Sequence, residues 1–155
     1  MLLILSILMF IKKNYLTQVA ENVFSPATAQ RDKTELHVRF TGIHHPKGKL
    51  FVALYDREAA FLNVQKAHTL KVLPIGEGGD FTLSLGDLPA GEYALASYHD
   101  LNNNGKLDKN LLGIPTEPYG FSNNARPKFR APNWAEAKFA LGEGGAAVAV
   151  RMEKW

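Results

Sequence analysis

Apolar and polar side chains alternate along much of the chain after residue 33. Leu36, Val38 and Phe40 are separated by polar or charged residues throughout the segment 34–41. Successive side chains of a strand point to opposite faces, so this pattern predicts a strand with one buried and one wet face. The segment 50–55 is apolar at nearly every position, which is typical of a central strand covered on both faces.

Seven segments carry such strand patterns, at residues 34–41, 50–55, 69–73, 81–85, 92–99, 135–141 and 147–153. Turn-forming clusters separate them at intervals of about 8–12 residues, and residues 142–145 are expected to join the last two as a hairpin. No amphipathic helical pattern extends over about twelve residues. We therefore expect an all-β protein, an antiparallel β-sandwich of about seven strands with Ig-like or transthyretin-like topology.

The composition agrees with one folded domain. The chain has 155 residues, of which 46% are hydrophobic and 21% are charged. Its net charge of +3 is dispersed, with no run of five or more Lys or Arg, and this argues against nucleic-acid binding or a basic membrane-binding surface. The absence of Cys excludes disulfides, thiol catalysis and Cys-ligated metals.

The N-terminal segment indicates the compartment. Residues 1–11 are almost continuously apolar, but as a helix they would span only ~16 Å, too short for a ~30 Å hydrocarbon core. That length fits the apolar region of a signal peptide, and Ala27-Thr28-Ala29 fits a cleavage site. We therefore expect the protein to be exported, to the periplasm or beyond, with 1–29 as a signal peptide or leader and 30–155 as a single β-sandwich domain.

Two details of this segment leave its fate open. Lys12 and Lys13 follow the apolar stretch, whereas a signal peptide carries its positive charges before it. The distance from the stretch to the cleavage motif is also long. A misplaced start codon or an uncleaved N-terminal anchor would explain both features, so the membrane is expected to be a partner only through such a leader.

The segment 99–108, His-Asp-Leu-Asn-Asn-Asn-Gly-Lys-Leu-Asp, carries a calcium-loop pattern. Calcium binds six to eight oxygens, and acidic or amide side chains at alternate positions of a curled loop point their oxygens at one centre. Gly105 at the sixth position allows the sharp turn. The predicted metal ligands are Asp100, Asn102, Asn104, the backbone carbonyl of Lys106, and Asp108.

The twelfth position of the pattern departs from it, because Leu111 stands where a bidentate Glu is expected. Asn110, Glu117 or water would have to complete the coordination. We therefore expect weak calcium binding, with a dissociation constant of about 0.1–1 mM. The alternative is a metal-free turn, in which Asn and Asp are present because they tolerate left-handed backbone.

A second candidate surface lies in the segment 113–134, which is long for a connection inside a compact domain. Its side chains Tyr119, Phe121, Asn123 and Trp134 would form a carbohydrate- or peptide-binding surface if they are exposed. Alternatively, the aromatic side chains cap the open end of the sandwich. An enzyme using His99 with Asp100 or Asp108 is a third hypothesis, which requires both groups in one cleft.

The chain also resembles a known family. The matching residues are 91–100, Asn102, Asn104, Gly105, Leu107, Asp108, 113–115, Glu117 and 119–124. They are similar to the bacterial family catalogued as domain of unknown function 2141, and the strand pattern agrees over about 34–153. The resemblance implies a small exported protein with one β-sandwich domain and no established activity. Residues 88–93 also resemble a segment of carboxypeptidase-regulatory and transthyretin-like domains, which are usually non-catalytic.

These observations lead to one principal hypothesis. The protein is expected to be a non-enzymatic, exported β-sandwich that binds calcium in the 100–108 loop for stability. Its partner would be an extracellular or periplasmic ligand or protein, which the sequence does not identify.

Overall fold

The computed structural model describes residues 33–76 and 79–155, so the predictions for residues 1–29 lie outside it. Its strands are β1 (Lys33–Thr41), β2 (Lys49–Tyr55), β3 (Thr69–Pro74), β4 (Phe81–Pro89), β5 (Gly91–Asp100), β6 (Tyr119–Phe121), β7 (Phe139–Leu141) and β8 (Ala146–Arg151). The helical segments are short, namely η1 (Glu58–Ala60), η2 (Val64–Lys66), η3 (Ser122–Asn124) and α2 (Trp134–Ala137). Within the described ranges, no helix is both long and apolar enough to span a membrane.

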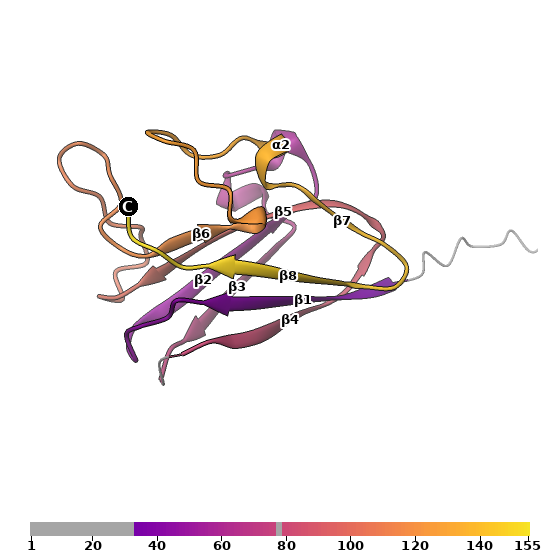
Figure 1. Ribbon diagram of the computed structural model, residues 1–155, viewed down its shortest axis with the longest axis horizontal. Coiled ribbons are helices and arrows are strands. Elements are labelled where there is room, and N and C mark those ends of the chain that lie inside the picture. Colours follow the sequence, from indigo (N-terminus) through magenta and orange to yellow (C-terminus); the bar gives the residue numbers. More distant parts are fainter. Residues whose placement is uncertain (1–32, 77–78) are drawn as a thin grey trace, which may run out of the picture. The chain divides into compact units, whose positions relative to one another are not determined.

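The strands form two sheets (Figure 1), which confirms the all-β sandwich expected from the sequence. One sheet has the order β4-β1-β8 and the other has the order β3-β2-β5-β6, with β7 pairing with the beginning of β5. The strands pair in antiparallel fashion except for β1 and β8, which run parallel. This parallel pair places the first and the last of the described strands side by side.

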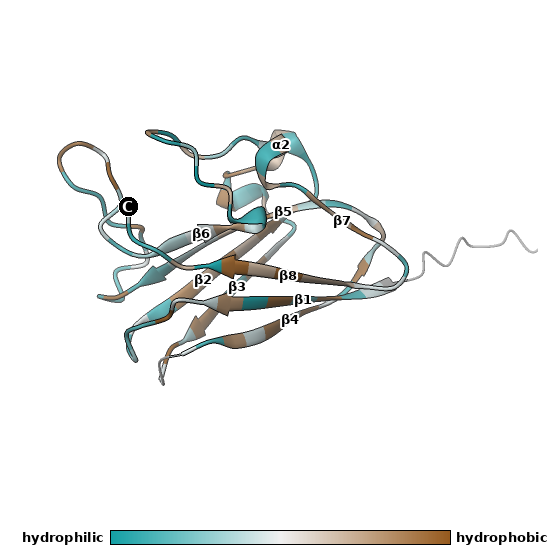
Figure 2. Ribbon diagram, in the orientation of Figure 1, coloured by the Kyte–Doolittle hydropathy of each residue, from teal (hydrophilic) through white to brown (hydrophobic). Residues whose placement is uncertain are grey.

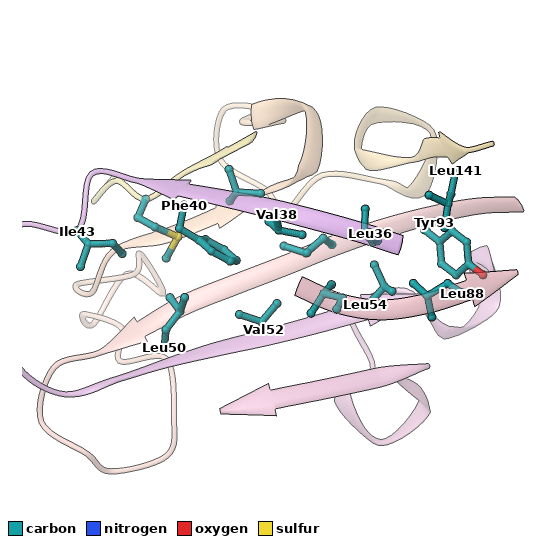
Figure 3. Packing of buried hydrophobic residues seen from close by; sticks show 14 of the residues in the cluster. Leu36, Val38, Phe40, Ile43, Leu50, Val52, Leu54, Leu88, Tyr93 and Leu141 are labelled. Atoms are coloured by element: carbon teal, nitrogen blue, oxygen red, sulfur yellow. The ribbon is translucent and has the colours of Figure 1, made fainter. Parts of the chain in front are cut away.

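The main hydrophobic core lies between the two sheets (Figure 3). The alternating residues of β1, Leu36, Val38 and Phe40, are completely buried, as the period of two predicts. Leu50 and Leu54 of β2 are buried in the same cluster. Burial of a large aliphatic side chain contributes roughly 1.5–3 kcal/mol, so this alternation is a principal source of stability. Figure 2 shows brown, apolar stretches along the strands and teal on many of the connecting segments.

A smaller core covers the outer face of the five-stranded sheet. Ala53, Tyr55 and Ala94 contribute to it from the sheet, and Trp134 and Ala137 of α2 cover them. Strand β2 is therefore buried on both faces over much of its length, with the exposure pattern expected of a central strand. This second layer explains why 50–55 shows almost no polar residue.

Lys71 links the two sheets at one open side of the sandwich. Strands β3 and β4 are both edge strands there. Lys71 pairs in register with the core residue Val52, so its side chain leaves β3 on the inner face. Its Nζ donates a hydrogen bond to the Ser84 carbonyl oxygen of β4 at 2.8 Å. The hydrogen bond from Lys71 therefore connects the edge strands β3 and β4 across this open side of the sandwich.

The predicted strand 135–141 is wrong in its first half. Residues Trp134–Ala137 form the short helix α2, which begins with a capping box between Asn133 and Glu136. Such a pair satisfies two backbone N–H groups at a helix start, and its Asn-x-x-Glu spacing was the overlooked sequence signal. Residues 142–145 do form a tight turn, but β7 pairs with β5 and β8 pairs with β1. The turn therefore passes the chain between sheets and does not close a hairpin.

Strand β6 was not predicted, because three residues are too few to show a period. Its central residue, Gly120, lies against β8: a Cβ there would be 2.6 Å from the Arg151 carbonyl oxygen and 2.7 Å from a Val150 methyl carbon. Tyr119 also forms a bridge with Glu153 after the end of β8. The absence of a side chain at Gly120 therefore allows β6 to join the two sheets closely.

We predict that Gly120→Ala lowers the free energy of unfolding by about 1–3 kcal/mol, because the new methyl group would overlap a backbone oxygen that cannot move independently. The measurement is urea denaturation. The matched control is Gly142→Ala, where a Cβ meets nothing within 4 Å, so the change should stay within about 0.5 kcal/mol. Equal stability of the two variants would contradict this account of β6.

Candidate functional site

Strand β5 positions the candidate site, because it ends at Asp100, where the Asp/Asn-rich loop begins. Asp100 is completely buried and pairs in register with Lys49 of β2. Gly48 lies directly on its backbone, with a positive φ of 83° and no room for a Cβ beside the Asp100 carbonyl oxygen. The first residue of the loop is thus held by the sheet and by the preceding turn.

The loop bends around the Asp100 carboxylate. Oδ1 accepts a hydrogen bond from the Asn104 N–H at 3.1 Å, and Oδ2 accepts one from the Gly105 N–H at 2.7 Å. Asn103 and Gly105 have positive φ angles of 62° and 78°, which Asn and Gly tolerate better than other residues. These residue types therefore allow the curl that brings two backbone donors onto one carboxylate.

The side chains of Asn102, Asn104 and Asp108 converge on one another. The Nδ2 atoms of Asn102 and Asn104 donate to the two Asp108 carboxylate oxygens at 2.7 and 2.8 Å. The Asn102 Oδ1 shares the Asn104 N–H with Asp100, and the Asn104 Oδ1 accepts the Lys106 N–H at 2.8 Å. The four side chains singled out from the sequence therefore gather inside one loop.

Glu117 joins the two ends of this loop. It is only 4% exposed, and its Oε1 and Oε2 accept hydrogen bonds from the backbone N–H groups of Leu101 at 2.8 Å and Asp108 at 3.1 Å. Asn110, the other residue considered for completing the coordination, instead accepts the N–H groups of Leu112 and Ile114 in the next turn. Of the two, Glu117 is the one that contacts the loop.

The loop concentrates negative charge. Within the described residues, no ion pair involves Asp100, Asp108 or Glu117. The Tyr98 hydroxyl donates to the Gly105 carbonyl oxygen at 3.1 Å. Burial raises the pKa of Tyr98 to about 12, and the charges of Asp100 and Glu117 add to the effect. Tyr98 was missed from the sequence, although it lies two residues before Asp100.

Carboxylates and imidazoles alone do not make a metal site here. In the part of the chain that the structure describes, no group of three or more His, Cys, Asp or Glu side chains is placed to hold a metal ion. An ion in this loop would therefore depend on the Asn102 and Asn104 amide oxygens and on a backbone carbonyl. The Lys106 carbonyl accepts no hydrogen bond from the described residues.

The environment of His99 is that of a buried residue inside the domain. It is completely buried, and its Nε2 lies 2.6 Å from the Lys47 carbonyl oxygen, while Nδ1 has no partner among the described residues. Consecutive strand residues point to opposite faces, so His99 and Asp100 diverge. Two surface depressions of about 580 and 360 Å³ are lined by other residues. Neither of these two depressions holds His99 together with an acid.

The proposed aromatic ligand surface is largely buried. Tyr119 and Trp134 are only 9% and 8% exposed. The Arg126 guanidinium covers the Tyr119 ring at 4.4 Å, and Trp134 packs edge-on against Phe61 with ring centroids 5.9 Å apart. These two rings do not present a free face to a sugar or peptide, and Trp134 covers the outer sheet face instead of an end of the sandwich.

The other two residues of that surface have interaction partners in the domain, although Asn123 is exposed. Phe121 is half-buried, with its ring 5.9 Å from that of Tyr119. The Asn123 Nδ2 donates to the carbonyl oxygens of Glu136 and Lys138 at 3.2 and 2.8 Å. Phe121 and Asn123 thus connect residues 121–123 to neighbouring parts of the domain.

Acid titration should reveal the cap of α2. Hydrogen bonds from Arg130 and from the Asn133 N–H lower the pKa of Glu136 to about 2, from 4.5. A depressed folded-state pKa stabilises the protein above pH 4.5, and that contribution is lost as the pH falls towards 2. We predict that Glu136→Gln lowers the melting temperature at pH 7 and that the difference disappears near pH 2. Glu143→Gln, in the exposed turn before β8, is the control, and a Glu136→Gln effect that persists undiminished at pH 2 would refute the assignment.

Comparison with known proteins identifies one family. A family model described as "Uncharacterized protein conserved in bacteria (DUF2141)" matches residues 38–149. The matched part includes the 100–108 loop, Glu117 and strands β2 to β7. Searches of curated proteins and of solved structures find no match.

Proposed function

This chain belongs to the bacterial family DUF2141, which is described as uncharacterised, and we propose that its 100–108 loop binds calcium and thereby stabilises an exported, non-enzymatic β-sandwich domain. One observation carries the proposal. Asp100, Glu117 and Asp108 gather around one loop, the first two buried, and no cationic side chain of the described residues pairs with them. Buried carboxylates without a positive partner are costly, and a divalent cation would offset that cost.

The donor atoms suit a hard cation. Each amide oxygen of Asn102 and Asn104 accepts one N–H, and a carbonyl oxygen has two lone pairs, so each retains one for an ion. The Asp100 and Asp108 carboxylates and the Lys106 carbonyl would complete a set made only of oxygens. Such a set favours calcium over zinc or copper, and a loop of amides and carbonyls fits the variable coordination of calcium better than the strict octahedron of magnesium.

Glu117 would support the ligands from outside the shell. Its two oxygens hold the N–H groups beside the first and last ligands, so it fixes the width of the loop. Partners that orient ligands in this way raise metal affinity. Only two ligands carry charge, so the affinity would be in the weak, 10⁻⁴–10⁻³ M class of extracellular modules. A site in this class fills where calcium is abundant, which is consistent with the proposed export.

A metal-free turn is the competing account. The hydrogen bonds around Asp100 and Asp108 satisfy the loop without an ion. The two accounts differ in one respect: only a cation site makes stability depend on calcium concentration.

We predict that about 10 mM CaCl₂ stabilises the full-length protein by about 1.5–3 kcal/mol relative to EDTA, as ligand binding to the folded state requires for a dissociation constant of 0.1–1 mM. Thermal denaturation measures the effect as a rise in melting temperature of several degrees. MgCl₂ at the same concentration should give a smaller rise, and NaCl at matched ionic strength should give none. A melting temperature unaffected by calcium would disprove the calcium site.

Charge-removing variants assign the effect to the loop. Asp108→Asn should fold but lose most of the calcium-dependent shift, because it removes one of two charged ligands. Asp87→Asn, at an exposed position of β4, is the matched control and should retain the full shift. If Asp108→Asn responds to calcium as strongly as the parent, the ion binds elsewhere.

A further inference from the structure

A small hairpin rises directly from the candidate calcium loop. The Thr116 N–H donates to the Asp108 carbonyl oxygen at 2.8 Å, and Lys109 and Pro115 form the next bridge. At the tip, the Asn110 N–H donates to the Ile114 carbonyl oxygen at 2.9 Å. The segment 109–115 is therefore a hydrogen-bonded structure, with defined directions for its side chains.

The tip of this hairpin presents two leucines to solvent. Leu111 is 105% exposed and Leu112 is 83% exposed, so neither side chain rests on the domain. The Asn110 Oδ1 accepts the N–H groups of both Leu112 and Ile114, and Gly113 has a positive φ of 76°. The backbone thus holds the leucines outward, although folding them onto the domain would bury apolar area. Figure 2 shows apolar colour on this outlying loop.

The exposed charge beside the leucines is positive. Lys106 and Lys109 are exposed and have no ion pair among the described residues. The nearby carboxylates of Asp108 and Glu117 face the loop interior, where they accept hydrogen bonds. The hairpin and the adjoining loop therefore present apolar side chains together with two exposed lysines that make no ion pair among the described residues. The total charge of the chain did not indicate this, because the arrangement is local.

We propose that the 109–115 hairpin docks the domain on an anionic lipid surface, with Leu111 and Leu112 entering the interface between headgroups and acyl chains. A projecting tip needs no shaped partner in a bilayer, and apolar insertion together with Lys attraction to anionic lipid provides the two signals that membrane binding requires. A protein partner is less well matched, since two side chains are far short of the roughly 800 Å² per partner of a standard interface. The proposal stands on the hairpin alone and does not require the calcium site.

The absence of Cys from the chain allows a site-specific test. Leu112→Cys in the full-length protein is labelled with a polarity-sensitive fluorophore and mixed, in EDTA, with vesicles of equal parts phosphatidylcholine and phosphatidylglycerol. We expect a blue shift of the emission, and a smaller shift with phosphatidylcholine alone. Glu143→Cys, labelled in the turn between β7 and β8 at the other end of the sandwich (Figure 1), should keep its aqueous emission.

Substitutions separate the two contributions. The double variant with Leu111→Ser and Leu112→Ser should bind the vesicles at least about tenfold more weakly, because it removes the apolar groups that insert. The double variant with Lys106→Gln and Lys109→Gln should lose only the preference for anionic vesicles. Both should keep the parent melting temperature in EDTA, since these side chains are exposed and Gln retains the Lys106 backbone carbonyl of the candidate calcium site.

Three results would overturn the proposal. The first is an aqueous emission from the label at position 112 on vesicle-bound protein, which would mean that another segment makes the contact. The second is an emission shift that follows protein concentration without vesicles, which would assign the tip to a second copy of the chain. The third is equal binding of the double-serine variant and the parent protein.

Discussion

The conformation of the 100–108 loop depends on how the two buried carboxylates of Asp100 and Glu117 obtain hydrogen-bond donors. Asp100 and Glu117 are almost inaccessible to water, so their oxygens must be satisfied by the chain. They receive four backbone N–H groups, from residues 101, 104, 105 and 108. A loop that turns these donors inward is necessarily curled, and its alternate side chains then face a common interior. The convergence of the Asn and Asp side chains and the position of the 109–115 hairpin both follow from this constraint.

The sandwich makes that constraint possible. Strand β5 lies between β2 and β6, with apolar cover on both of its faces, so its last residue is fixed before the loop begins. Gly48 supports the same residue from the neighbouring turn. Because Asp100 is held in place, the short polar loop that follows it adopts one arrangement. The hydrogen bond from the Thr116 N–H to the Asp108 carbonyl oxygen then connects this loop to the 109–115 hairpin. The core thus holds the polar loop through Asp100, and the loop in turn holds the 109–115 hairpin through the Thr116–Asp108 hydrogen bond.

The sequence predicted those features that depend on local pattern. Strands with one wet face were found because burial enforces a period of two, and the oxygen-bearing loop was found because its spacing lies within nine residues. The helix at Trp134 and the strand at Tyr119 were missed because one turn or three residues establish no period. The double contact of Glu117 depends on a register that brings residues 101 and 117 together, which no local pattern encodes. Leu111 was interpreted only as a missing ligand, because exposure is a property of the folded chain.

The link from Lys71 to the Ser84 carbonyl has a further consequence. Strand β3 is an edge strand of its sheet within the described residues, and Leu70 and Val72 are exposed on its outer face, a combination that favours edge-to-edge aggregation. An ammonium group on the inner face would lose its water if a foreign strand extended the sheet and closed over that side. Inward-pointing charges of this kind disfavour edge-to-edge pairing of sheets, so Lys71 both joins the two layers and makes the β3 edge a poor template for another strand.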